Sequence, residues 1–164
     1  MGMAKGTGSG TGATANGGVT KRALLVVDVQ NGFVNAVTEQ IPGRVRALIE
    51  DGGYAPVLFT RFVNCDDSPY RRILDWHECA GSPEADLAPE LADLAPAGAV
   101  YRKDGFTGIP DGLADRLRAE GLDEVAVVGI DTDMCVLKVA MDVFDLGIRP
   151  VVLVDCCAST AGLQ

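Results

Sequence analysis

Five short apolar runs, none of which alternates with polar residues, constrain what this chain can fold into. They are ALLVVDV at 23–29, PVLFTRFV at 56–63, GAVYRK at 98–103, EVAVVGI at 124–130 and PVVLVD at 150–155. A strand with one face in water alternates apolar and polar residues, whereas a strand covered on both faces reads as a continuous apolar run. The five runs therefore predict the strands of a parallel sheet that is covered on both sides.

Helical patterns separate these runs. Residues 43–53 end in a Gly pair, residues 110–122 begin with Pro and contain Gly near their end, and residues 132–147 carry apolar residues at helical spacing. Pro in the first turn and Gly just past the last turn are typical of helix boundaries. The alternation of strands and helices predicts a three-layer α/β/α sandwich with a mostly parallel, doubly wound sheet.

The composition indicates one globular domain and narrows its partners. The chain has 164 residues, of which 48% are hydrophobic, and a formal net charge of -9. This length fits one domain, and the negative charge argues against nucleic acid or an anionic membrane as a partner. We interpret residues 1–20, rich in Gly, Thr and Ala, as a disordered tail, and we expect the domain to occupy residues 21–164.

The chain contains five cysteines, an odd number whose spacing matches neither a disulfide framework nor a zinc framework. No apolar run approaches the roughly 20 residues that a membrane span needs, and the N-terminal segment lacks the apolar core of a secretory signal. Reduced thiols and a cytoplasmic location are therefore the expectation.

The segment 64–92 does not follow the strand and helix rhythm. It is long and is interrupted by Ser-Pro and Ala-Pro pairs. Long connections in compact domains are often lids or partner surfaces. We predict a short helix over 83–91 and irregular structure around Trp76.

Polar residues that end separate strands form a candidate site. Three such residues lie at or after the ends of different runs, namely Asp28, Lys103 and Cys135. The carboxyl ends of parallel strands share one edge of a sheet. At the start of a helix, and near Lys103, the Cys135 thiolate is expected to be favoured, while Asp28 is placed to accept its proton. The alternatives are a packing cysteine, a turn-capping Asp28 and a solvated Lys103.

Three motifs, VVDVQNGF, RKDGFTG and GIDTDMCV, resemble those of the isochorismatase-like cysteine hydrolases, which include nicotinamidases and N-carbamoylsarcosine amidases. The resemblance extends from Ala23 to Ser159. It implies that a small amide or related C–N bond is cleaved through a covalent thioester. It also implies an Asp28, Lys103 and Cys135 triad.

The same resemblance implies a cis peptide between Ile130 and Asp131, and an oxyanion hole formed by the amides of Asp131 and Cys135. Nicotinamidases of this family carry an Asp-x-His metal site after the second strand, whereas the sequence here is TRFVNCDDSPY. We therefore expect no metal and no cofactor. Family members also continue beyond the point where this chain reads AGLQ, which suggests a truncated C-terminal end.

Several residues near the strand ends are candidates for contact with a small-molecule substrate. Aromatic side chains are expected as pocket walls, and Gln30 and Asn64 as polar contacts to a substrate, with bracing of the catalytic loop as the alternative for Gln30. Ordinary core packing is the alternative for each aromatic residue. The candidates are Gln30, Phe33, Phe62, Asn64, Trp76 and Phe106.

Two other functions remain open at this stage. One is an isochorismatase, which would hydrolyse a vinyl ether with Asp28 as the acid and would not need the thiol. The other is a catalytically silent, oligomeric binding protein. The resemblance also implies a homo-oligomer, either a dimer or a tetramer, and the long connection around Trp76 offers a surface for such an assembly.

Overall fold

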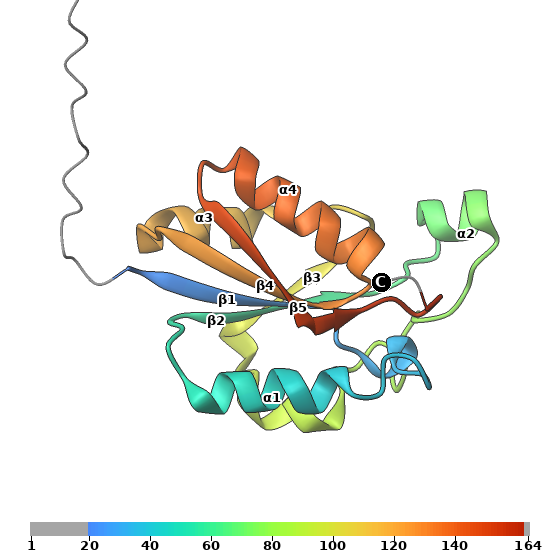
Figure 1. The fold of residues 1–164 in the computed structure, drawn as a ribbon. Coiled ribbons are helices and arrows are strands. Elements are labelled where there is room, and N and C mark those ends of the chain that lie inside the picture. Colours follow the sequence, from blue (N-terminus) through green and yellow to red (C-terminus); the bar gives the residue numbers. More distant parts are fainter. Residues whose placement is uncertain (1–19, 163–164) are drawn as a thin grey trace, which may run out of the picture.

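The computed structural model describes residues 20–162. A five-stranded, all-parallel sheet forms its centre, with the strand order β3-β2-β1-β4-β5 (Figure 1). The α/β architecture and the parallel sheet predicted from the apolar runs are confirmed, and each run contributes one strand. The strands are β1 Arg22–Val27, β2 Val57–Phe62, β3 Val100–Lys103, β4 Glu124–Ile130 and β5 Arg149–Ala158.

Helices cover both faces of the sheet, as expected for a three-layer sandwich. In Figure 1, α1 (Ile41–Asp51) lies below the sheet, and α3 (Asp111–Glu120) and α4 (Leu137–Asp145) lie above it. A π-helical turn, Thr132–Val136, precedes α4. These helices match the three helical patterns of the sequence to within a few residues.

The long connection differs from its prediction. The expected helix over 83–91 is absent from the described residues. A 3₁₀ helix, Pro89–Leu94, forms instead, because the Pro89 ring fits the first turn of a helix but not its interior. A short helix that was not predicted, α2 (Pro69–Leu74), begins at Ser68, whose side chain accepts a hydrogen bond from the backbone N–H of Arg71.

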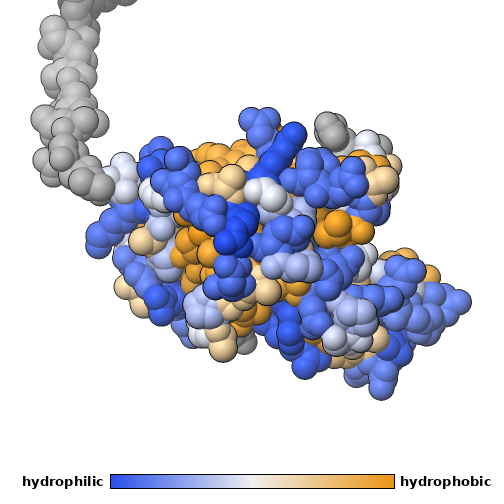
Figure 2. Space-filling model, turned by 90° about the horizontal axis from the view of Figure 1, so that it is seen from below, coloured by the Kyte–Doolittle hydropathy of each residue, from blue (hydrophilic) through white to orange (hydrophobic). Residues whose placement is uncertain are grey.

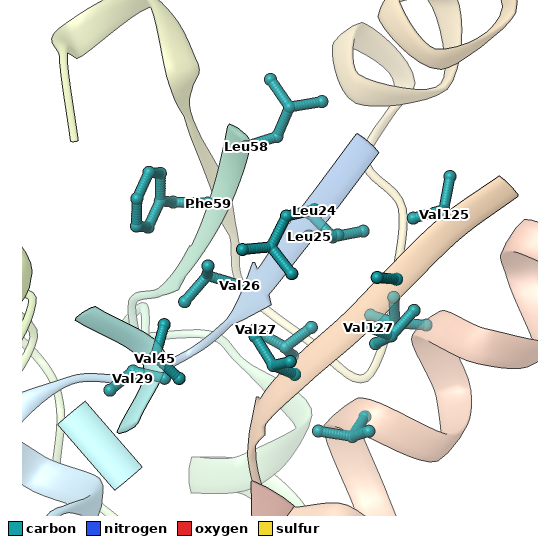
Figure 3. Packing of buried hydrophobic residues seen from close by; sticks show 14 of the residues in the cluster. Leu24, Leu25, Val26, Val27, Val29, Val45, Leu58, Phe59, Val125 and Val127 are labelled. Carbon is teal, nitrogen blue, oxygen red and sulfur yellow. The ribbon is translucent and has the colours of Figure 1, made fainter. Parts of the chain in front are cut away.

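The hydrophobic core is centred on β1. Residues 23–27 are fully buried, and the Leu and Val side chains among them pack against Phe59 of β2, Val127 of β4 and Val45 of α1 (Figure 3). Each fully buried Val or Leu side chain contributes about 1.5–3 kcal/mol by its removal from water. Burial of both faces of β1 is the physical reason why its sequence shows no alternation.

Gly129 allows β4 to approach β1 closely. It pairs with Val27 in the parallel register and has a φ of 131°. A Cβ atom at this position would lie 2.0 Å from the carbonyl oxygen of Val27. Only Gly can occupy such a position without displacing the neighbouring strand.

The face that carries α1 is largely hydrophilic, with smaller hydrophobic patches between the polar residues (Figure 2). Within residues 20–162, no helix is both long enough and apolar enough to cross a bilayer. The cysteines Cys65, Cys79, Cys135, Cys156 and Cys157 are all free of disulfide bonds. The predicted disordered tail, 1–20, lies outside the described residues except for Thr20.

Candidate active site

The candidate site lies at the point where the order of the strands reverses. From β1 the chain continues to β2 and β3 on one side, whereas β4 and β5 lie on the other side. The connecting helices therefore leave from opposite faces, and a crevice opens at the carboxyl ends of β1 and β4. Asp28 directly follows β1, and Asp131 directly follows β4.

Asp28 and Lys103 form a buried ion pair at this edge. A carboxylate oxygen of Asp28 lies 2.6 Å from Nζ of Lys103, and both side chains are almost completely inaccessible to water. The hydroxyl of Thr60 donates a hydrogen bond of 2.8 Å to the other carboxylate oxygen. The Asp28 backbone has a φ of 49°, a conformation that Asp tolerates better than most residues and that turns its carboxylate toward Thr60 and Lys103.

Cys135 lies in the π-helical turn before α4 and is 8% exposed. Its thiol is close enough to Asp28 and Lys103 for both of their charges to shift its pKa. The structure thus brings together the three residues that the sequence placed at separate strand ends. Two parallel strands and a helix start hold them, so each is fixed by backbone that is itself packed in the core.

The electrostatics of Cys135 differ from the sequence-based expectation. Burial raises the pKa of its thiol to about 12, with a further rise caused by Asp28, and the opposing effect of Lys103 is smaller. The expected thiolate, favoured by the helix start and Lys103, is therefore not the resting form. Burial lowers the pKa of Lys103, but Asp28 and Cys135 outweigh burial and raise it, so the ammonium persists.

Asp131 anchors the turn that carries Cys135. The peptide bond between Ile130 and Asp131 is cis. The Asp131 carboxylate accepts hydrogen bonds from the backbone N–H of Thr160, at 2.6 Å, and from the Thr160 hydroxyl, at 3.2 Å. Burial raises the pKa of this carboxyl, while the Thr160 hydrogen bonds lower it in part. The end of β5 thereby fixes the strand-to-helix turn.

A cavity of about 480 Å³ opens beside these residues. Cys135 and Asp131 border it, so a molecule inside it would contact the thiol. The remaining lining residues are mostly aromatic or aliphatic. They come from the 3₁₀ turn Asn31–Phe33 and the loop after it, from β2, from the long connection, from the loop after β3, from the π-helical turn and from the segment just after β5. They are Gly32, Phe33, Asn35, Phe62, Tyr70, Leu74, Trp76, Glu78, Phe106, Met134 and Thr160.

The aromatic side chains form one contiguous group. The ring of Tyr70 lies 4.9 Å from that of Phe62 and 4.9 Å from that of Phe106, while Phe33 and Trp76 stack at 6.3 Å. These separations fall in the range of favourable aromatic pairs. Four of the five were candidates from sequence. Tyr70 was missed because it belongs to the unpredicted α2, and only the Ser-Pro start of that helix signalled it.

Gln30 was a candidate for substrate contact, and the structure corrects this. Its side chain is fully buried, accepts a hydrogen bond from the backbone N–H of Phe62, and donates to the carbonyls of Phe62 and Ala85. All of these bonds are to backbone, so Gln30 joins the end of β2 to the long connection. It braces the site, which was the alternative reading.

Asn64 also points away from the cavity. It is 1% exposed and donates to the carbonyls of Trp76 and Glu78, both at 2.9 Å. Its oxygen accepts a hydrogen bond from Ser68, the residue that caps α2. Asn64 therefore positions two lining residues and helix α2, and it has no free polar atom to offer to a substrate.

The residues at the end of β2 do not fit the metal site that the family resemblance implies for nicotinamidases. Within residues 20–162, no group of three His, Cys, Asp or Glu side chains is close enough to hold a metal ion. Phe62, the last residue of β2, lines the cavity. The single histidine, His77, is exposed and contacts Asp75.

Comparisons with known proteins agree with this geometry. The isochorismatase domain family matches residues 22–163. The nicotinamidase/pyrazinamidase of Mycobacterium tuberculosis is 34% identical, over 85% of this chain and 88% of that protein. The streptothricin hydrolase of Streptomyces noursei is 34% identical, over 84% of this chain and 50% of that protein. The structure of N-carbamoylsarcosine amidase from Thermoplasma acidophilum has a TM-score of 0.73 at 29% identity, covering 85% of this chain and 84% of that one.

The family match spans most of the chain, and these relatives are hydrolases, two of them amidases by name. The chain therefore belongs to the isochorismatase family and is a hydrolase of that family.

Proposed function

We propose that this hydrolase is a cysteine amidase in which Asp28, Lys103 and Cys135 act together on a small amide. The observation that carries the proposal is the position of the Cys135 thiol at the edge of the cavity, close enough to the buried Asp28–Lys103 pair for both charges to act on its pKa. A nucleophile, a base within hydrogen-bonding range and a third group that orients the base are the components of covalent catalysis.

In the first half of the reaction, the Asp28 carboxylate takes the proton of the Cys135 thiol, and the sulfur attacks the carbonyl carbon of the amide. The carbonyl oxygen becomes an oxyanion, which the backbone amides of Asp131 and Cys135 stabilise. Asp28 then gives its proton to the amide nitrogen. The C–N bond breaks, an amine or ammonia leaves, and a thioester remains on Cys135.

In the second half, Asp28 takes a proton from water, and the resulting hydroxide attacks the thioester carbon. The C–S bond breaks, the carboxylic acid leaves, and the sulfur recovers the proton held by Asp28. Lys103 keeps its charge throughout and stabilises each anion that forms beside it. The raised pKa of Cys135 suits this sequence, because the thiol stays protonated until a substrate is in place.

Two variants test the nucleophile. We expect Cys135→Ala to abolish turnover, because no thioester can form, and Asp28→Asn to lower kcat/KM by about 10²–10⁴-fold, because general acid–base catalysis is lost. Cys65→Ala is the matched control, since Cys65 does not line this cavity. The substrate panel contains small amides, ureas and isochorismate, and intact mass spectrometry would detect the acyl adduct on Cys135.

The same experiment discriminates among the three functions. In vinyl-ether hydrolysis, Asp28 would protonate a substrate carbon directly, so Asp28→Asn would fail while Cys135→Ala kept its activity. Retention of more than about a tenth of the wild-type kcat/KM by Cys135→Ala, a loss below about 1.4 kcal/mol, would replace the amidase proposal with the isochorismatase one. Absence of turnover and of adduct across the whole panel would favour a silent binding protein.

Assembly and location remain predictions. Exposed apolar side chains at Met134, Leu137, Met141 and Phe144 recur at helical spacing through the π-helical turn and α4. Such a stripe supports the predicted homo-oligomer. The five free thiols support the predicted cytoplasmic location.

A further inference from the structure

The charged side chains that line the cavity are all acidic. Among its lining residues, the charged side chains are Glu78 and Asp131, and neither a lysine nor an arginine belongs to that lining. Lys103 is buried and is not among the lining residues, and its charge is matched by Asp28 at 2.6 Å. Within residues 20–162, the cavity lining therefore offers a substrate two acidic side chains and neither a lysine nor an arginine.

The pKa values of neighbouring groups agree with the acidic lining. Burial raises the pKa of the Tyr70 hydroxyl, and the charges of Asp28, of Asp131 and of Cys135 when it is ionised raise it further. Burial likewise raises the pKa of Asp131, and Asp28 and Asp133 add to the rise. Each acid makes it harder to place another negative charge nearby, which applies equally to an anionic ligand.

The remainder of the wall consists of aromatic rings. Phe33, Phe62, Tyr70, Trp76 and Phe106 line one cavity and contact one another at ring separations of 4.9–6.3 Å. The face of an aromatic ring carries partial negative charge and attracts a cation within about 6 Å. Rings that line a cavity together with carboxylates, and without Lys or Arg in that lining, favour a weakly hydrated positive group.

We propose that the cavity selects amides whose distal end carries a cationic nitrogen, with the aromatic rings and Glu78 receiving the cation while the amide lies against Cys135. This inference rests on the proposed amidase function for the orientation of the substrate. A carboxylate at the same end is rejected, because it would be desolvated against carboxylates and ring faces with no positive partner.

A purely hydrophobic cavity is the alternative explanation, and a set of three amides separates the two. Betaine amide and tert-butylacetamide have almost the same shape and differ in a positively charged nitrogen against a neutral carbon. Malonamate presents a carboxylate at the same distance from the amide. A hydrophobic cavity prefers the neutral compound, whereas a cation site prefers betaine amide.

The measurement is the Kd of each amide for the Cys135→Ala protein by calorimetry, together with kcat/KM for the wild type. Binding to the variant needs no nucleophile, so it tests selectivity even if the amidase proposal fails, and turnover tests the amidase proposal separately. We expect betaine amide to bind at least about tenfold more tightly than tert-butylacetamide, and malonamate to bind at least about tenfold more weakly than tert-butylacetamide.

Two further substitutions in the Cys135→Ala background identify the side chains that cause the preference for betaine amide. Trp76→Leu removes a ring but keeps an apolar side chain, and we expect the preference for betaine amide to fall to within about threefold. Glu78→Gln should reduce it by about threefold, since an exposed carboxylate contributes modestly. Phe144→Leu and Glu90→Gln are matched controls at exposed positions outside the cavity, and they should leave the preference unchanged.

Circular dichroism of each variant establishes that it is folded, and Glu78→Gln serves alone if Trp76→Leu does not fold. Equal or tighter binding of tert-butylacetamide would overturn the proposal. So would tightest binding of malonamate, or a preference for betaine amide that survives every cavity substitution that folds.

Discussion

The ammonium of Lys103 lies in the protein interior beside the Asp28 carboxylate, and both side chains are at most 1% exposed. Removing two charges from water is costly, and their mutual attraction offsets that cost only while both are present. Thr60 adds a hydrogen bond to the carboxylate. The pair is therefore a structural element of the candidate site as well as part of its proposed chemistry, and each partner depends on the other.

A double-mutant cycle measures this dependence. We expect Lys103→Met to lower the free energy of unfolding by about 3 kcal/mol, because it leaves the Asp28 carboxylate buried without its cation. Adding Asp28→Asn should cost much less in this background than in the wild type, since the unpaired charge is then removed. Urea unfolding monitored by Trp76 fluorescence gives the four free energies. Additive losses would mean that the two side chains are not coupled.

At the scale of the elements, β4 determines where the turn that carries Cys135 begins. Its continuation carries Asp131 and Cys135, and its position against β1 depends on the absence of a side chain at Gly129. The long connection has a complementary role. It holds the cavity wall in place through the short helix α2, which carries Tyr70, and through the buried amide of Asn64, which fixes the backbone of Trp76.

Gly129→Ala tests the close approach of β4 to β1. We expect a loss of at least about 2 kcal/mol in the free energy of unfolding, because Ala disfavours a φ of 131° and its Cβ would overlap Val27. The control is Gly43→Ala in α1, where a Cβ meets nothing within 4 Å. That change should stabilise the protein by about 0.5 kcal/mol. Similar effects of both substitutions would contradict the role given to Gly129.

At the scale of the whole molecule, buried thiols link stability to alkaline pH. Burial is the leading cause that raises the pKa of Cys79 to about 12, of Cys135 to about 12 and of Cys157 to about 11, from an ordinary value of 9.0. The folded protein therefore retains these protons at a pH where the unfolded chain has lost them. A state that binds more protons is destabilised relative to the other as pH rises.

We accordingly expect the free energy of unfolding to fall as the pH rises from about 9 to about 12, and to be insensitive to these thiols below about pH 8. Urea unfolding in the presence of a reductant, at intervals across this range, measures the slope. Cys157→Ala should make the slope shallower, whereas Cys65→Ala, at a partly exposed position, is the control. A free energy that stays constant or increases with pH would contradict the expectation.

The sequence by itself determined the architecture, because burial on both faces of a strand leaves a local pattern of apolar residues. It also placed Asp28, Lys103 and Cys135 at one edge, since the carboxyl ends of parallel strands must meet there. Their motifs predicted the family before any contact was known. These inferences depend on residues that are adjacent in sequence and on the general rules of sheet topology, and neither requires coordinates.

Only the tertiary structure decided how side chains are oriented and what surrounds them. Gln30 and Asn64 have residue types suited to binding, yet their hydrogen bonds go to distant backbone. Tyr70 reaches the cavity through a helix too short to leave a periodic pattern. The pKa of Cys135 rises because burial outweighs Lys103, and burial is a sum over atoms contributed by the whole fold.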